Sequence, residues 1–126
     1  MDYISDDLIM YLNKLIKTIE TQASFRFGNI FVVSQNRVDD ILCCIDVNFP
    51  KLLKVYSREF GIHRNIKSFE IYDKLIASIK YKPPFTKTVY AVCFDRASNL
   101  VKELQQSFVE DIAYIKKTHP NMSEND

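Results

Sequence analysis

Hydrophobic positions recur at steps of three and four residues along the last long stretch of the chain, from Asp95 to His119. This spacing puts them on one side of a single amphipathic helix. Asp95 or Ser98 can accept hydrogen bonds from the first turn, and Pro120 ends the pattern. We therefore expect the rest of the protein to pack against this helix. Its apolar positions are Ala97, Leu100, Val101, Leu104, Phe108, Ile112 and Ile115.

The same periodicity predicts a first helix that Ser5 caps and that runs to about Thr21. A second helix begins at Asn36, with two aspartates in its first turn. The buried faces of these two helices are expected to be Leu8, Leu12, Leu15, Ile16 and Ile19 in the first, and Val38, Ile41, Leu42 and Ile45 in the second.

The pattern breaks at Asn48-Phe49-Pro50, and Pro50 suits the first turn of a new helix. This third helix would end at Gly61, where a glycine can close the last turn. A fourth helix begins at Asn65 or Ser68 and runs to about Lys80. With the final helix, the chain is expected to hold about five helices.

Two stretches are rich in β-branched and aromatic residues, at 24–34 and 86–94. In the first, Gly28-Asn29 can form the turn of a tight hairpin, although a buried helix is the competing interpretation. In the second, both alternating sets of side chains are apolar, which predicts a strand buried on both faces. The alternative is that this segment extends the final helix.

The predicted fold is therefore mainly α, a compact helical domain with short β segments near 25–33 and 88–94, and α+β is the alternative. A chain of 126 residues, 47% hydrophobic and 26% charged, fits one globular domain, expected at 1–120 with a disordered polar tail at 121–126. Two glycines, against roughly nine at the average usage of about 7%, argue against a phosphate-binding loop and favour helices with short connections.

Cysteine usage and hydropathy bear on the compartment. The three cysteines are Cys43, Cys44 and Cys93, an odd number in apolar surroundings, which predicts reduced thiols in a core. No apolar run is long enough for a signal peptide or a membrane span. We expect an intracellular protein, cytoplasmic or nuclear, without a membrane partner.

Charge is unevenly distributed although the net charge is only +1. Residues 51–87 carry nine basic and three acidic side chains, net +6, between more acidic ends. Such a basic region can bind an acidic protein or the phosphates of a nucleic acid. A sequence pI near 7.7 is below the value above 9 that is typical of nucleic-acid-binding domains. The predicted partner-binding or nucleic-acid-binding residues are Lys51, Lys54, Arg58, Arg64 and Lys67.

No catalytic or metal-binding constellation is visible. His63 and His119 lie far apart, and the adjacent Cys43 and Cys44 point to different sides of a helix. Cys93 lies in an apolar run that would keep its thiol protonated and inert. We therefore expect no catalytic residues, no metal, no cofactor and no enzymatic activity.

The remaining pattern indicates a non-catalytic protein–protein interaction module, such as a small subunit or adaptor of a larger assembly. Aromatic residues in excess of a core favour contact with another chain or with a second copy of this one. The aromatic residues expected at the surface are Tyr3, Tyr11, Phe49, Phe85 and Tyr114. The alternative is a nucleic-acid-binding accessory protein that uses the basic 51–87 region.

Overall fold

A computed structural model of the chain describes the backbone at residues 3–60, 67–84 and 88–118. Side chains are described at 7–47, 67–84, 88–111, 113–114 and 117. This part of the chain contains four helices and three strands, so the fold is mainly α, as the hydrophobic pattern predicts. The helices are α1 (Tyr3–Gln22), α2 (Gln35–Phe60), α3 (Lys67–Ile79) and α4 (Phe94–Thr118), and the strands are β1 (Phe25–Phe27), β2 (Ile30–Ser34) and β3 (Val89–Cys93).

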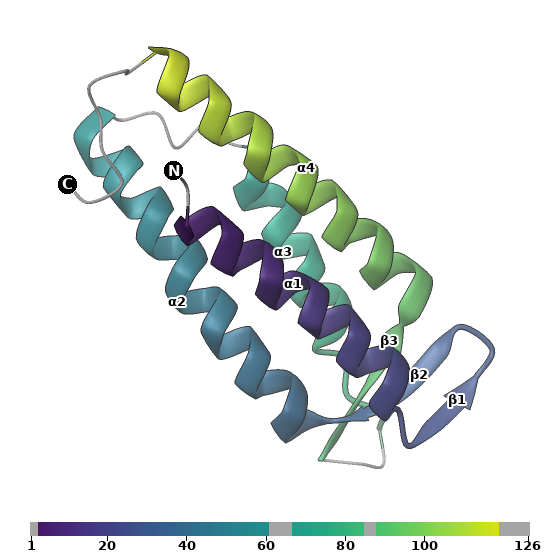
Figure 1. Cartoon of the computed structure of the whole chain (residues 1–126). Coiled ribbons are helices and arrows are strands. Elements are labelled where there is room, and N and C mark those ends of the chain that lie inside the picture. The colour runs from purple at the N-terminus through teal and green to yellow at the C-terminus, as the bar shows by residue number, and fades with distance from the viewer. Residues whose placement is uncertain (1–2, 61–66, 85–87, 119–126) are drawn as a thin grey trace.

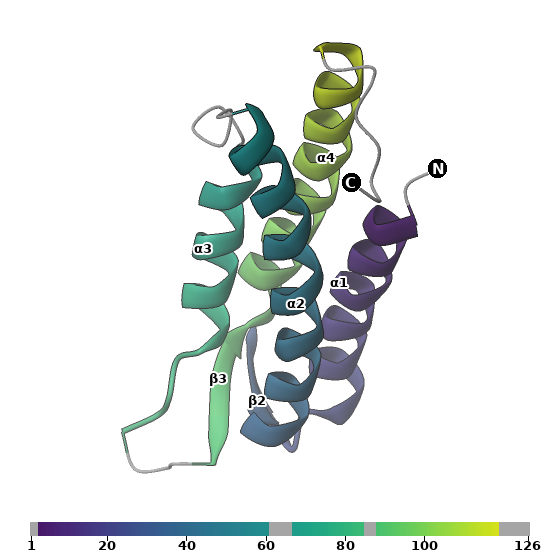
Figure 2. The ribbon, with the colours of Figure 1, turned by 90° about the vertical axis from the view of Figure 1, so that its left-hand side faces the viewer.

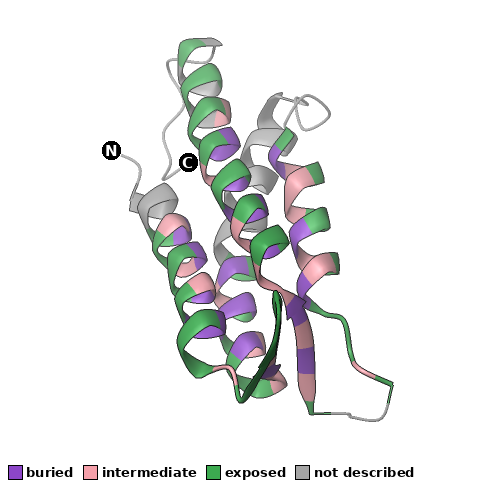
Figure 3. Ribbon diagram, turned by 90° about the vertical axis from the view of Figure 1, so that its right-hand side faces the viewer, coloured by how far each residue is buried: buried purple, intermediate pink, exposed green. Residues whose placement is uncertain are grey.

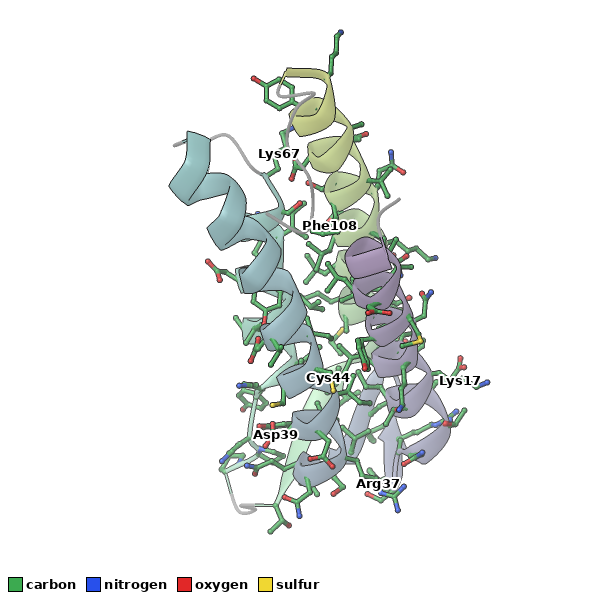
Figure 4. The ribbon with its side chains drawn as sticks, turned by 60° about the vertical axis from the view of Figure 1, so that its left-hand side comes forward. Lys17, Arg37, Asp39, Cys44, Lys67 and Phe108 are labelled. Atoms are coloured by element: carbon green, nitrogen blue, oxygen red, sulfur yellow. The ribbon has the colours of Figure 1, made fainter. Side chains whose placement is uncertain are left out.

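The final helix holds the position that its pattern predicts. Helix α1 packs between α2 and α4, and α4 also packs on α3 (Figures 1 and 2). Phe108 points from α4 into the core (Figure 4), where it is 1% exposed. The side chains of Ile112 and Ile115 lie outside the described residues. The other expected positions on this helix are buried, namely Ala97, Leu100, Val101 and Leu104.

The predicted core positions of the first two helices are also confirmed, except that Ile16 is only half-buried. Cys43 was expected in the core and is exposed. The reason is geometric, because the buried face of α2 passes through Leu42 and Ile45 and leaves Cys43 about 100° away around the helix. Cys44 and Cys93 are half-buried, and the three cysteines form no disulfide.

The predicted break at Asn48-Phe49-Pro50 is wrong, since α2 continues through Pro50 to Phe60 as one helix of 26 residues. The second and third predicted helices are therefore one helix. A proline inside a helix costs about 3 kcal/mol, which packing of the flanking turns can outweigh. Helix α2 begins at Gln35, so Asp39 and Asp40, which were predicted to lie in its first turn, lie after that turn.

Both β-prone stretches form strands, and together they make an antiparallel sheet in the order β1-β2-β3. Gly28 has a φ of +59°, while Asn29 does not have a positive φ. This is the pattern of a type II′ turn, in which glycine takes the first central position of a two-residue hairpin loop. The hairpin of β1 and β2 lies at the end of the bundle where α1 ends (Figure 1).

Backbone hydrogen bonds join the sheet to the helices at both ends of the β2–β3 pair. The N–H of Phe94 donates to the carbonyl of Asn29 over 2.8 Å, and the N–H of Gln35 donates to the carbonyl of Thr88 over 2.9 Å. These residues begin α4 and α2, so the strand register fixes where both helices leave the sheet.

Candidate interaction surface

Of the five basic residues predicted from the sequence to bind a partner, only Lys67 has a described side chain. The side chains of Lys51, Lys54, Arg58 and Arg64 lie outside the described residues. Lys67 begins α3, is exposed, and lies at the end of the molecule opposite to the sheet (Figure 4). It lines an open groove of about 510 Å³ together with Ile71, Lys102, Glu103, Gln106, Ser107 and Glu110. Two lysines face two glutamates there, so this groove has no excess of positive charge for a phosphate backbone.

A buried polar cluster holds the start of α3 against α4. The hydroxyl of Ser68 donates to Asp111 Oδ2 over 2.5 Å, and the N–H of Ser68 reaches the same oxygen over 3.3 Å. The Ser107 hydroxyl lies 3.2 Å from that of Ser68. Asp111 therefore caps the N-terminus of α3 from a neighbouring helix. Ser68 is fully buried, so its hydroxyl is closed to a substrate.

A second buried hydrogen bond joins the sheet to α2. The hydroxyl of Tyr90 donates to Asp39 Oδ1 over 2.7 Å. Burial raises the pKa of the Tyr90 phenol to about 12, and the neighbouring carboxylate of Asp39 adds to the rise. Of the two adjacent aspartates in the sequence, Asp39 thus has a structural partner, which explains its position without acid–base chemistry.

The two faces of the sheet differ in what covers them. Val33, Tyr90 and Val92 are at most 3% exposed, so this inner face packs on the helices. The opposite, outer face was expected to be buried as well. On β3 it is only half-buried at Val89, Ala91 and Cys93 (Figure 3).

Directly paired residues lie on the same side of a sheet, so the strand register builds the outer side from three rows. One row is Phe27, Ile30 and Cys93, the second is Phe25, Val32 and Ala91, and the third pairs Ser34 with Val89 at the end that β1 does not reach. We call the six residues of the first two rows, which cross all three strands, the outer face. The exposed fraction of the side chains rises across the sheet towards β1, from 36% at Ile30 on β2 to 59% at Phe25 and 75% at Phe27 on β1.

Arg26 lies between the two phenylalanines of β1 and points to the inner side of the sheet. Its guanidinium stands over the ring of Phe31, 4.5 Å from the centroid, and donates to the carbonyl of Glu20. Phe31 in turn stacks on Phe94, with ring centroids 4.7 Å apart. These contacts hold β1 on the bundle and leave Phe25 and Phe27 on the other side of the strand.

Sequence reasoning placed the exposed aromatic residues elsewhere. Tyr114 is exposed as expected, Tyr11 is half-buried, and the side chains of Tyr3, Phe49 and Phe85 lie outside the described residues. Phe25 and Phe27 were recognised only as strand-forming residues. The signal that could have found them is their spacing of two beside a tight turn, which puts both on one face of a short terminal strand.

No three His, Cys, Asp or Glu side chains among the described residues lie close enough to hold a metal ion. His63 and His119 are outside that part of the chain. None of the helices, over their described residues, combines the length and hydropathy needed to cross a bilayer.

In comparison with known proteins, the chain matches no protein-family model, no curated protein and no solved structure.

Proposed function

We propose that this chain is a non-catalytic protein–protein interaction module, a small subunit or adaptor of a larger assembly, and that its partner covers the outer face of the sheet. The observation that carries the proposal is the composition of this face. An antiparallel sheet that faces water on one side normally alternates apolar and polar residues. Here all six residues of the outer face are apolar, although the hairpin end is exposed, and the polar Ser34 lies only in the third row, beyond the end of β1.

Removing the exposed phenylalanines of the outer face from water is favourable. A large aromatic side chain contributes roughly 200 Å² of surface when it is fully buried. At 59% and 75% exposure, Phe25 and Phe27 together leave roughly 270 Å² in water. At about 25 cal/mol per Å², covering this area would contribute roughly 7 kcal/mol before the costs of association. An area of this size is close to that of the largest apolar patch on an ordinary monomer, about 300–600 Å², which often has a function.

The polar clusters of the described chain support a non-catalytic role. A hydrolytic serine needs a base that can take its proton and room for a substrate beside it. Ser68 has a carboxylate partner but no access to solvent, and the Tyr90–Asp39 pair is occupied between the sheet and α2. Both clusters are explained by the packing of elements.

Site-specific photo-crosslinking tests the proposed function. Phe27 would be replaced by benzoylphenylalanine, which keeps an aromatic ring on the outer face. The matched control carries the same residue at Val109, which is 51% exposed on α4. We expect irradiation in the cells of origin to attach one protein at position 27 and not at position 109. Attachment of RNA or DNA, or equal products from both positions, would contradict the proposal.

A further inference from the structure

We infer that the partner binds as an extended segment that pairs with β1 and presents an acidic side chain opposite Arg26, between two apolar side chains. This inference rests on the proposed function and names the chemistry of its partner. It follows from which edge of the sheet is open, which charges surround that edge, and how much area it offers.

The open edge of the sheet is β1. It is the outermost strand, while the far edge at β3 is already engaged, because the N–H of Ala91 donates to the carbonyl of Tyr81 over 2.8 Å. In a two-residue hairpin the residues beside the loop, here Phe27 and Ile30, form the hydrogen-bonded pair. The next pair is not hydrogen-bonded, so the N–H and C=O of Arg26 point away from β2. They are available to an added strand.

The side chains of β1 dictate what that strand must carry. Residues directly opposite each other in an antiparallel pair share a face of the sheet. A segment paired with β1 therefore needs apolar side chains beside Phe25 and Phe27 on the outer face, and its intervening residue lies beside Arg26 on the inner side.

The side chain that would face the partner's intervening residue, Arg26, is a cation. Lys17 and Arg37 lie at the same end of the molecule as the sheet (Figure 4), and Arg37 bonds the side chain of Gln22, the last residue of α1. Glu20 contributes its carbonyl to Arg26 and carries one negative charge. Asp39 also lies at this end of the molecule, where it accepts from Tyr90 on the inner face, so the preference rests on Arg26 itself. Opposite charges that face each other across paired strands are favourable, so an aspartate or glutamate is favoured opposite Arg26.

A second copy of this chain fits the edge poorly. Symmetric antiparallel pairing of two β1 strands about their central residue would place Arg26 directly opposite the same residue of the partner, and like charges in that position are destabilising. Face-to-face packing is limited by area, because a stable interface buries about 800 Å² on each side. The two phenylalanines offer roughly 270 Å². An extended segment adds main-chain hydrogen bonds and needs less area.

The test uses blocked synthetic peptides and the isotopically labelled full chain. One peptide has a central glutamate flanked by valines within a threonine and serine context, and its control has lysine in place of the glutamate. Amide shifts are followed by NMR during titration. We expect the glutamate peptide to bind about twofold to fivefold more tightly than the lysine peptide, with shifts centred on residues 24–28.

Substitutions at Arg26 separate its side chain from its backbone. R26E should reverse the preference between the peptides, and R26A should remove it. R26P also removes the outward N–H, which an edge strand tolerates, and should abolish binding of both peptides. K102E, an exposed change on α4, should leave the preference intact. Equal binding of the two peptides to the unaltered chain, shifts confined to other elements, or no binding would overturn the inference.

The two proposals can fail separately. A protein cross-linked at position 27, together with peptides that do not bind at β1, would leave the interaction surface standing and refute strand pairing. A light-scattering mass of twice 14.8 kDa that F25S/F27S returns to the single-chain value would identify a second copy as the occupant and would also refute strand pairing.

Discussion

Gly28 is the residue on which the exposed hairpin most directly depends. Its φ of +59° belongs to a region that L-residues rarely adopt, and the space around it is open, with no atom within 4 Å of an added Cβ. The cost of a side chain there is therefore conformational and involves no clash. The position of Phe25 and Phe27 on one face follows from this turn.

Replacing Gly28 by alanine should lower the free energy of unfolding by about 1–2 kcal/mol, because alanine pays the full cost of a positive φ. Urea denaturation followed by circular dichroism would measure the change. N29A is the matched control, since Asn29 does not have a positive φ, and it should change stability by less than about 0.5 kcal/mol. Equal effects of the two substitutions would show that the turn is not of this type.

Tyr90 gives the fold a specific alkaline sensitivity. Its pKa is about 12 in the folded protein, against 10 as the ordinary value. Below pH 10 the phenol is protonated in both states, and its contribution is fully present. As the pH rises from 10 to about 12, the unfolded chain loses this proton first, so stability falls by up to about 3 kcal/mol.

The substitution Y90F should remove that part of the pH dependence. At neutral pH it should also cost about 1–2 kcal/mol, because Asp39 loses its buried donor. Unfolding free energies measured at intervals from pH 7 to pH 12 would show both effects. A decline above pH 10 that is identical in the two proteins would mean that other groups cause it.

At the scale of elements, the apolar stripes of the helices were predicted correctly from the sequence, and the boundary between two helices was not. The stripes of α1 and α4 were readable because one face of each helix packs on several neighbours, and the expected residues are buried. The interruption at Pro50 was misread, since a single proline gives the same signal whether it starts a helix or lies within one. Only tertiary packing decides between these outcomes.

The continuity of helix α2 through Pro50 can be tested by substituting this proline. In a continuous helix, an alanine there restores the N–H that would donate to the carbonyl of Asp46, four residues earlier. P50A should raise the free energy of unfolding, by up to about 3 kcal/mol, and should not lower the helical signal in circular dichroism. A loss of stability would favour the helix boundary that the sequence pattern predicts at this residue.

The strands were predictable as strands, but their environment was not. Residues 89–94 alternate between two apolar sets, which correctly predicted β3 and wrongly predicted burial on both faces. An apolar pattern indicates that side chains are favoured in a buried environment. It does not distinguish burial within the same chain from burial against another protein. The outer face is the place where this distinction matters, and the sequence alone held no sign of it beyond the spacing of Phe25 and Phe27.

At the scale of the whole molecule, the helices cover one face of the sheet and leave the other to solvent at the hairpin (Figures 1 and 3). The apolar core and the apolar surface are thus separated by the thickness of one sheet. A change on the outer face should consequently alter binding more than folding. Substitutions of exposed residues usually change stability by less than about 0.5 kcal/mol each.

The central claim is that another protein covers the outer face, and quantitative affinity purification with F25S/F27S tests it most directly. The unaltered chain, this double variant and V109S as the exposed apolar control would be compared in cells of origin, after circular dichroism has shown equal folding. We predict that one protein is recovered with the unaltered chain and with V109S, and that its recovery falls at least tenfold with F25S/F27S. Equal recovery with all three proteins would contradict the account.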